Sequence, residues 1–362
     1  VATPGDGSFN VLRVENSAYE WNTVSSENQD GSTDWLMAIK KDRQGQKTVV
    51  AEVPAYMSLT GAGFEQTRNL VRHIEDQTAA AKTYSPVCNG YYDYAYNGKP
   101  LYNVWVSPTY NSASVDSPAK FDADIYGVEA GGDVQQDANN RLGVFASYRH
   151  GEYDVDGKNK FFAAEKSSDI DIDSYLAGLY YRYDRQNLWA MATVFGGIQK
   201  GDLKTSDGIK ADSDATELGA ALRGGYSFKL SDTLVLEPQV GAAYTMIDWD
   251  DINDGYKNAR YGAASLWELE AGVKLEKTVS LRGETAKWYI KPSIIKTFAD
   301  NDKVEISGLR SIRTMDDNTL GRIAGGVVYQ LNNRLNVYGN AGYTFGDDYE
   351  NVSADIGLSY AF

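Results

Sequence analysis

The chain has 362 residues, and its 35 basic and 50 acidic side chains give a formal net charge of −15. This sign argues against a nucleic-acid partner, which would need a basic face. One Cys and two His cannot build a disulfide framework or a thiolate metal site. No run of eighteen apolar residues is present, so no transmembrane helix is expected, and we expect no cofactor.

Residues 1–45 contain three short strand-like runs. These runs, at 9–15, 18–24 and 33–39, are rich in β-branched and aromatic residues and are separated by Gly, Ser and Asn. Three short strands bury little apolar surface on their own. This segment is therefore interpreted as the end of a larger β-rich region that precedes it.

Residues 46–98 contain the one convincing helical pattern, predicted at about 62–80. Pro54 disfavours a helical conformation for Val53, so residues 52–56 are expected to be extended. The weak apolar stripe of the helix is flanked by three cationic or titratable side chains: Arg68, Arg72 and His73. A surface helix on a soluble domain is the alternative. The lone Cys88 in this segment is given no role.

From residue 99 onward the sequence predicts twelve long strands. They are expected at 102–112, 123–135, 140–154, 170–184, 187–200, 214–230, 233–249, 262–277, 286–299, 318–331, 334–346 and 350–362. Apolar and polar residues alternate along them, most clearly in the last strand. Alternation of this kind gives each strand one dry face and one wet face.

Three features indicate that these strands cross a membrane. They reach or exceed the 9–11 residues that a tilted membrane strand needs, short turns alternate with longer loops, and aromatic residues mark the strand ends. Hydrocarbon offers no hydrogen-bond partner, so a membrane-spanning sheet must close on itself. The fold class predicted for 99–362 is therefore an all-β membrane protein, a twelve-stranded antiparallel transmembrane barrel.

The polar faces of the strands carry charges that are expected to line the lumen. The acidic ones are Glu129, Asp133, Glu217, Glu237, Glu268 and Glu270, and the basic ones are Arg223, Lys229, Lys274, Lys291 and Arg322. A barrel of this size has room for one helix. We hypothesise that the helix plugs the pore, with its arginines facing lumen carboxylates.

Several segments together resemble the translocator β domain of monomeric autotransporters, the type V secretion proteins. They are Glu52-Val-Pro-Ala-Tyr56 ahead of a helix, Tyr126-Gly-Val-Glu-Ala-Gly-Gly-Asp133, Leu142-Gly-Val-Phe-Ala-Ser-Tyr148, Leu236-Glu-Pro-Gln239 and an aromatic C-terminus. The resemblance covers residues 46–362. Residues 1–45 resemble the closing rungs of a pertactin-like β-solenoid passenger.

The resemblance implies a barrel in the outer membrane of Gram-negative bacteria that helps to secrete and display its own N-terminal passenger at the cell surface. The implied partners are outer-membrane lipid, the β-barrel assembly machinery, periplasmic chaperones and the chain's own passenger, and a monomer is expected. Asp355, Gly357, Tyr360 and Phe362 fit the family's assembly signal. Such a terminal strand could pair with an exposed sheet edge of the assembly machinery.

Some members of that family cut their own linker at an Asn-Asn pair in the helix. Here Asn69 is followed by Leu70, so no cleavage inside the barrel is predicted. A passive porin is one alternative function, and an outer-membrane protease is another. The protease would need an acid–His pair at the rim, for which His150 with Glu152, Asp154 and Asp156 is the candidate. We expect no enzymatic activity.

Overall fold

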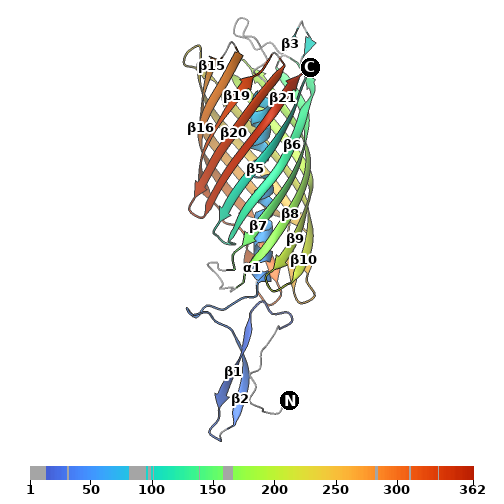
Figure 1. Cartoon of the computed structure of the whole chain (residues 1–362), viewed down its shortest axis with the longest axis vertical. Helices are drawn as coiled ribbons and strands as arrows, with labels where there is room; N and C mark the ends of the chain where they lie inside the picture. Colours follow the sequence, from blue (N-terminus) through green and yellow to red (C-terminus); the bar gives the residue numbers. More distant parts are fainter. Residues whose placement is uncertain are drawn as a thin grey trace.

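The computed structural model describes residues 14–30, 32–80, 95–96, 99–100, 102–137, 139–157, 166–281, 284–309, 311–332 and 334–362. Figure 1 shows a tall barrel of tilted strands with helical segments in its interior and a β-hairpin beyond one end. Neither described helix is both long enough and apolar enough to cross a bilayer.

Twelve long strands form the barrel. They are β5 (Asn103–Val115), β6 (Phe121–Gln136), β7 (Asn140–Val155), β8 (Ser168–Arg185), β9 (Leu188–Thr205), β10 (Lys210–Tyr226), β12 (Leu234–Trp249), β15 (Ala264–Leu281), β16 (Glu284–Asp300), β19 (Thr319–Gln330), β20 (Leu335–Gly346) and β21 (Tyr349–Ala361). Strands that follow one another in this series pair antiparallel, and the two-residue β11 (Phe228–Lys229) extends the sheet beside β12. The last strand pairs with the first, from Tyr349↔Val115 to Ala361↔Asn103. The sheet is therefore closed and has no edge inside the bilayer.

An apolar band covers the outside of the barrel. On β21 the outward side chains of Val352, Ile356 and Leu358 are 48–60% exposed, whereas Ser353 and Ser359 point inward and are buried. On β16 the outward Trp288 and Phe298 are ten residues apart. At about 3.3 Å per residue and a tilt of about 40°, they are separated by about 25 Å along the barrel axis, which is the height of a bilayer's apolar band.

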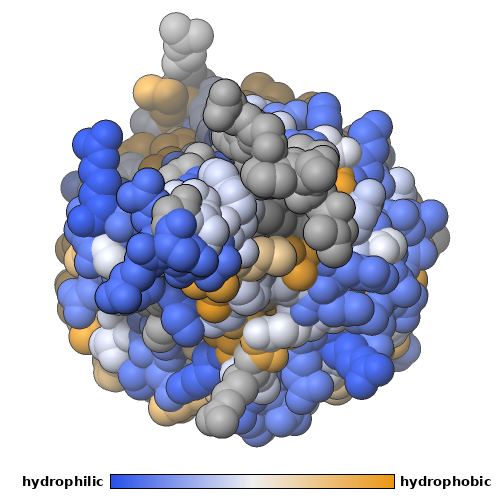
Figure 2. Space-filling view, turned by 90° about the horizontal axis from the view of Figure 1, so that it is seen from below, coloured by the Kyte–Doolittle hydropathy of each residue, from blue (hydrophilic) through white to orange (hydrophobic). Residues whose placement is uncertain are grey.

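The connections between strands give the orientation of the barrel. Two long ones, 250–263 and 301–318, lie at the end that carries the N-terminal hairpin, and the opposite end has shorter turns such as 186–187. Because outer-membrane barrels have short periplasmic turns and long outer loops, the hairpin end faces the cell exterior. Figure 2 views the molecule from this end and shows a mostly hydrophilic face.

The polarity of the strands inverts near the outer end. Tyr148 on β7 and Tyr175 on β8 point outward, with their ring centroids 5.2 Å apart. Four residues farther out along β7, the outward side chain is the exposed Glu152, whereas Tyr153 and Ile172 point inward and are buried. Above the aromatic side chains the wall has therefore left the lipid, and its inner face becomes part of a hydrophobic core.

Two helical segments occupy the barrel interior: α1 (Glu52–Thr67) and α2 (Leu70–Ala80). The helix thus begins ten residues before the predicted start at 62, and the expectation that residues 52–56 are extended is wrong. Pro54 occupies the first turn, where a backbone N–H has no intrahelical partner, so the missing donor costs little.

A small sheet closes the outer mouth of the barrel. It consists of β13 (Ile252–Asn253), β14 (Asn258–Tyr261), β17 (Lys303–Ile306) and β18 (Ile312–Arg313), which belong to two of the long outer connections. Its apolar residues, among them Ala259, Val304 and Ile306, join Ala18 and Val49 in one buried cluster with α1. The loops, the N-terminal segment and the helix are therefore packed as one unit.

The N-terminal hairpin consists of β1 (Trp21–Glu27) and β2 (Thr33–Ile39). At its base the backbone N–H of Glu20 donates to Thr48, that of Thr48 to Lys40, and that of Lys40 to Glu20. These strands overlap the predicted runs at 18–24 and 33–39, while most of the run at 9–15 lies outside the described residues. Two-residue strands β3 (Ala95–Tyr96) and β4 (Lys99–Pro100) precede the barrel.

Candidate functional site

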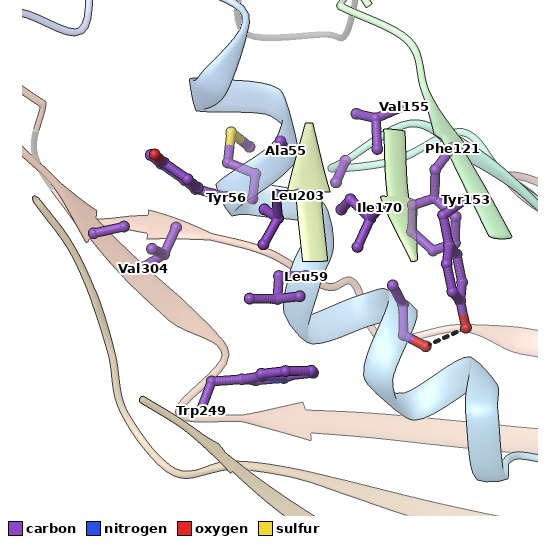
Figure 3. Packing of buried hydrophobic residues seen from close by; sticks show 14 of the residues in the cluster. Ala55, Tyr56, Leu59, Phe121, Tyr153, Val155, Ile170, Leu203, Trp249 and Val304 are labelled. Carbon is purple, nitrogen blue, oxygen red and sulfur yellow. Dashed lines mark hydrogen bonds between the residues drawn. The ribbon is translucent and has the colours of Figure 1, made fainter. Parts of the chain in front are cut away.

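The helix in the lumen is the candidate functional site, and its two halves contact different surroundings. α1 packs in the outer, apolar part of the barrel. Met57, Leu59 and Phe64 are at most 1% exposed and belong to one cluster with Leu203 and Trp249 of the barrel wall. Figure 3 shows Leu59 between these wall residues, and the dashed line marks the hydrogen bond that the Tyr153 hydroxyl donates to the carbonyl of Ala62, at 2.9 Å.

Polar contacts from the outer loops hold the start of α1. Lys257 Nζ lies 3.2 Å from Glu52 Oε1, and both side chains are fully buried. Tyr56 Oη donates to Asp254 Oδ2 at 2.7 Å, and Tyr261 Oη donates to the Tyr56 carbonyl at 2.9 Å. Burial raises the pKa of Tyr261 well above its usual value, so the phenol stays protonated and can donate.

Hydrogen bonds from uncharged donors join the middle of the helix to the wall. Thr67 Oγ1 and Gln199 Nε2 each donate to the carboxylate of Glu217 at 2.7 Å. Gln199 Nε2 also donates to the carbonyl of Gly63, and Gln66 Nε2 donates to the carbonyl of Ile172. Among the described residues Glu217 has no salt-bridge partner, so it anchors the helix through uncharged donors.

Arg68 and Asn69 interrupt the helix between α1 and α2. Arg68 pairs with Glu65 at 2.7 Å and lies over the ring of Tyr349 at 4.5 Å. Asn69 donates to Asn111 at 2.8 Å and to Asn351 at 3.2 Å, which ties the interruption to strands β5 and β21. The prediction that the chain is not cut at Asn69 remains a prediction, and the mass of a passenger-bearing chain would test it.

A continuous series of alternating charges connects α2 with strands β10, β15 and β16. Arg72 lies 2.9 Å from Glu270 and 3.6 Å from Glu268. Arg223 lies 3.0 Å from the same Glu270 and also pairs with Glu75 of the helix. Lys291 Nζ is 3.8 Å from Glu75. Neighbouring groups along this series have opposite charge, so most of the carboxylates and cations in it face two partners.

His73 of α2 contacts β6 and β21. His73 Nδ1 is 3.4 Å from Glu129, and Nε2 is 3.8 Å from Asp355. Glu129 also pairs with the fully buried Arg149, whose guanidinium donates to the carbonyl of Gln66. The helix is therefore held from several sides of the lumen at once.

The periplasmic end of the helix is capped by the barrel wall. α2 has no basic residue in its last turn. Instead Arg182 of β8 donates to Thr78 at 3.3 Å and lies over the ring of Trp189 at 4.5 Å, while Asn336 Nδ2 donates to the carbonyl of Ala80 at 3.3 Å. A cation near the C-terminus of a helix interacts favourably with its dipole.

The other predicted lumen charges lie inside the barrel and have polar partners on the barrel wall. Glu237 faces Lys274 at 3.3 Å, Asp133 accepts from the Tyr180 hydroxyl at 2.8 Å, and Arg322 donates to Thr344 at 2.9 Å. Lys229 is an exception, because it is exposed. It lies in β11 beyond the end of β10, where alternation no longer separates lumen from exterior, so its prediction as a lumen residue is wrong.

Several helix and lumen contacts were not predicted from the sequence. Glu75, Arg149 and Lys257 each contribute a buried ion pair. Arg149 lies on the inward face of β7, in alternation with the outward Tyr148, so the strand pattern carried a signal for it. The sequence contains no pattern that predicts the pairing of Lys257 with Glu52, because this contact depends on how a long loop folds back over the helix.

His150, the candidate rim residue, lies on the outside of the barrel. Its Nδ1 is 3.0 Å from Asp173, which also accepts a hydrogen bond from Tyr148 at 2.9 Å. Glu152 is 3.8 Å from Nε2, and no contact with Asp154 or Asp156 is present among the described residues. The described partners of His150 are carboxylates, and no nucleophilic hydroxyl or thiol is among them.

The predicted assembly-signal residues divide between the two faces of β21. Asp355 points into the lumen toward His73, whereas Tyr360 and Phe362 are 42% and 57% exposed on the outside. A Cβ on Gly357 would lie 2.0 Å from the hydroxyl of Tyr338. Only a glycine at this position leaves room for the ring of Tyr338 against the strand.

Comparison with known proteins agrees with this geometry. The model of the autotransporter β-domain family matches residues 104–342, which is more than half of the chain. The chain belongs to the autotransporter β-domain family. It is an outer-membrane barrel with a translocator fold, and α1 and α2 lie in its lumen.

Individual members of the family share the barrel at low sequence identity. The adhesin/invasin TibA of Escherichia coli O78:H11 is 28% identical over 234 residues, which is 62% of this chain and 23% of TibA. The translocator domain of NalP from Neisseria meningitidis matches with a TM-score of 0.61 at 13% identity, over 85% of this chain and 99% of that one. The transport unit of AIDA-I from Escherichia coli also gives 0.61, at 17% identity, over 79% and 97%. The chain therefore spans about a quarter of TibA, and the two structures support the fold.

Proposed function

We propose that this autotransporter β-domain exports and displays its own N-terminal passenger, and that the lumen helix is the last exported segment, retained as a plug. In this proposal residues 1–45 are the end of the passenger, 46–98 are the linker and 99–362 are the barrel. Outside the bilayer the hairpin base, the outer loops and α1 share one buried cluster, which supports a passenger that continues from the cell surface.

One observation carries the proposal. The hairpin of β1 and β2 lies beyond the outer end of the barrel, the chain then traverses the lumen as α1 and α2, and the helix ends at the periplasmic side, where Asn336 meets Ala80. The first barrel strand then starts from that same side. A chain arranged in this way has its N-terminal part outside the cell although its barrel is anchored in the membrane, which is the topology that export through the barrel would leave.

Outer-membrane lipid is proposed as a partner from the apolar surface of the barrel, and the assembly machinery and chaperones are proposed because the autotransporter family implies them. The exposed apolar band is covered by outer-membrane lipid, and the terminal strand β21 pairs with the β-barrel assembly machinery during insertion, before it pairs with β5. Periplasmic chaperones would protect the strands before insertion, because alternating strands without partners aggregate readily. We propose a monomer without catalytic activity, in which transport and display are the whole function of this part of the chain.

Surface display tests the proposal. A protease-sensitive reporter joined ahead of Val1 in full-chain form should be removed from intact cells by added protease, and the barrel should stay protected. The matched control is the same fusion with Phe362 deleted, whose folded yield should fall. A barrel that folds, shows the boiled and unboiled gel forms, and still retains the reporter in the periplasm would overturn the export proposal and favour a porin.

A further inference from the structure

We propose that Glu75, facing Arg223 and Lys291, fixes the axial register in which the helix comes to rest in the lumen. This inference rests on the proposed function, because it names the residue that determines where the exported chain stops. It concerns the position of the helix and goes beyond its presence in the pore.

The helix can slide along the lumen in steps of one turn, about 5.4 Å, because residues four apart occupy the same face. A step toward the cell exterior puts each residue in the place of the one four before it, and a step toward the periplasm does the reverse. The charge pattern of the helix can therefore be compared directly with the fixed charges of the wall.

Either step removes the carboxylate from the two wall cations. The residues four positions from Glu75 are Val71 and Ala79, so an apolar side chain would replace it beside Arg223 and Lys291. Both cations are buried, with Arg223 7% and Lys291 3% exposed. Arg223 would keep its contact with Glu270 at 3.0 Å, whereas Lys291 would lose the salt-bridge partner that it has among the described residues. A buried charge that loses its partner is strongly unfavourable.

A second pair of wall charges distinguishes the two directions. The residues four positions from Arg72 are Arg68 and Asp76. An outward step places Asp76 against Glu268 and Glu270, where the wall now holds Arg72 at 3.6 and 2.9 Å. Like charges at this distance repel. An inward step places Arg68 there and is tolerated by this pair. Of the contacts made by Arg72 and Glu75, it is therefore those of Glu75 that oppose an inward step.

The uncharged contacts do not define the register as sharply. Asn69 bonds to Asn111 and Asn351, and amides exchange partners readily because they both donate and accept. The apolar cluster around α1 resists sliding in both directions without regard to charge. Glu75 is therefore a positioning residue, and its effect can be measured as the axial position that the helix takes in the lumen.

Cross-linking measures this register. In a Cys88→Ser background, a Cys pair at 69 and 111 should react with a short thiol-specific cross-linker, whereas the pairs 65 with 111 and 73 with 111 report an inward and an outward step. Glu75→Lys should lower the 69–111 product at least about tenfold, since breaking a buried pair costs enough free energy for that, and the 65–111 or 73–111 product should rise. The exchange Glu75→Lys with Lys291→Glu should restore the 69–111 product. All yields are scored on protein that retains the gel shift of a folded barrel.

The controls separate this inference from the proposed function. Asp124→Lys makes the same charge change on the exposed outer wall and should leave the 69–111 product unchanged, and Glu75→Gln removes the charge without changing shape. Folded Glu75→Lys and Glu75→Gln proteins that cross-link only at 69–111, with native yield, would overturn the register assignment. A failed surface display with a normal register would instead overturn export alone.

Discussion

Removing one buried side chain from α1 should loosen the plug measurably. Leu59 is fully buried between Leu203 and Trp249, far from any charge of the α2 network. A Leu59→Ala substitution removes apolar contact and leaves a cavity that the surrounding barrel wall, fixed by its ladders of hydrogen bonds, cannot fill by moving. A rigid surrounding places such substitutions toward the costly end of their range.

The expected loss is about 2–5 kcal/mol in the free energy of helix release. Each 1.4 kcal/mol changes an equilibrium tenfold, so the released population should rise by about 30-fold or more. Tryptic cleavage reports this population, because Arg68 and Arg72 are buried in the lumen and become substrates only when the helix leaves it. The rate at which fragments beginning at Asn69 and His73 form, measured by mass in detergent, gives the free energy.

Leu222→Ala is the matched control, because Leu222 lies on the outside of β10 and is 63% exposed toward lipid. It should leave the cleavage rate at Arg68 and Arg72 within about twofold of the rate of the unsubstituted protein, because an outward side chain does not contact the helix in the lumen. Equal rates for Leu59→Ala and Leu222→Ala would refute the claim that apolar packing of α1 holds the helix.

Three further changes test other contacts. Lys257→Ala removes the ammonium that faces the buried Glu52, and should ease helix release by about 3–5 kcal/mol in the same tryptic assay; a rate like the parent's would count against the clamp formed by the outer loops. Gly357→Ala should lower the temperature at which the folded gel form is lost, because its Cβ would overlap Tyr338; in a Tyr338→Ala background the same change should have little further effect, and a full effect there would contradict this reason. Deleting Phe362 should lower the folded yield in membranes without changing the total amount synthesised, and normal insertion would exclude a role in assembly.

The barrel strands were predictable because their chemistry repeats every second residue. The predicted strand at 140–154 is observed at Asn140–Val155, and the one at 334–346 at Leu335–Gly346. The inversion of polarity between the two faces of the strands beyond Tyr148 was not predicted. Apolar and polar residues keep alternating there, but the outer face meets water and the inner face meets a hydrophobic core. The small sheet over the mouth also escaped prediction, because strands of two to four residues carry no periodic signal.

The lumen charges were predictable as a set, whereas their partners were not. Glu129, Glu217 and Glu270 all lie on inward positions, as strand alternation requires. Which of them meets which helix residue depends on the rotation and axial position of the helix, and neither is encoded in strand periodicity. The start of the helix was missed because Pro54 was expected to keep Val53 out of the helical conformation, although the first turn of a helix accepts proline.

The central claim is that a closed barrel spans the outer membrane with a helix filling its lumen. Its most direct test is the conductance of the purified chain in a planar lipid bilayer, compared with a variant that lacks residues 52–80, each checked for the gel shift of a folded barrel. The full chain should give small or no steady channels, and the variant should give larger, lasting ones. Equal conductance from two folded proteins would contradict the plug.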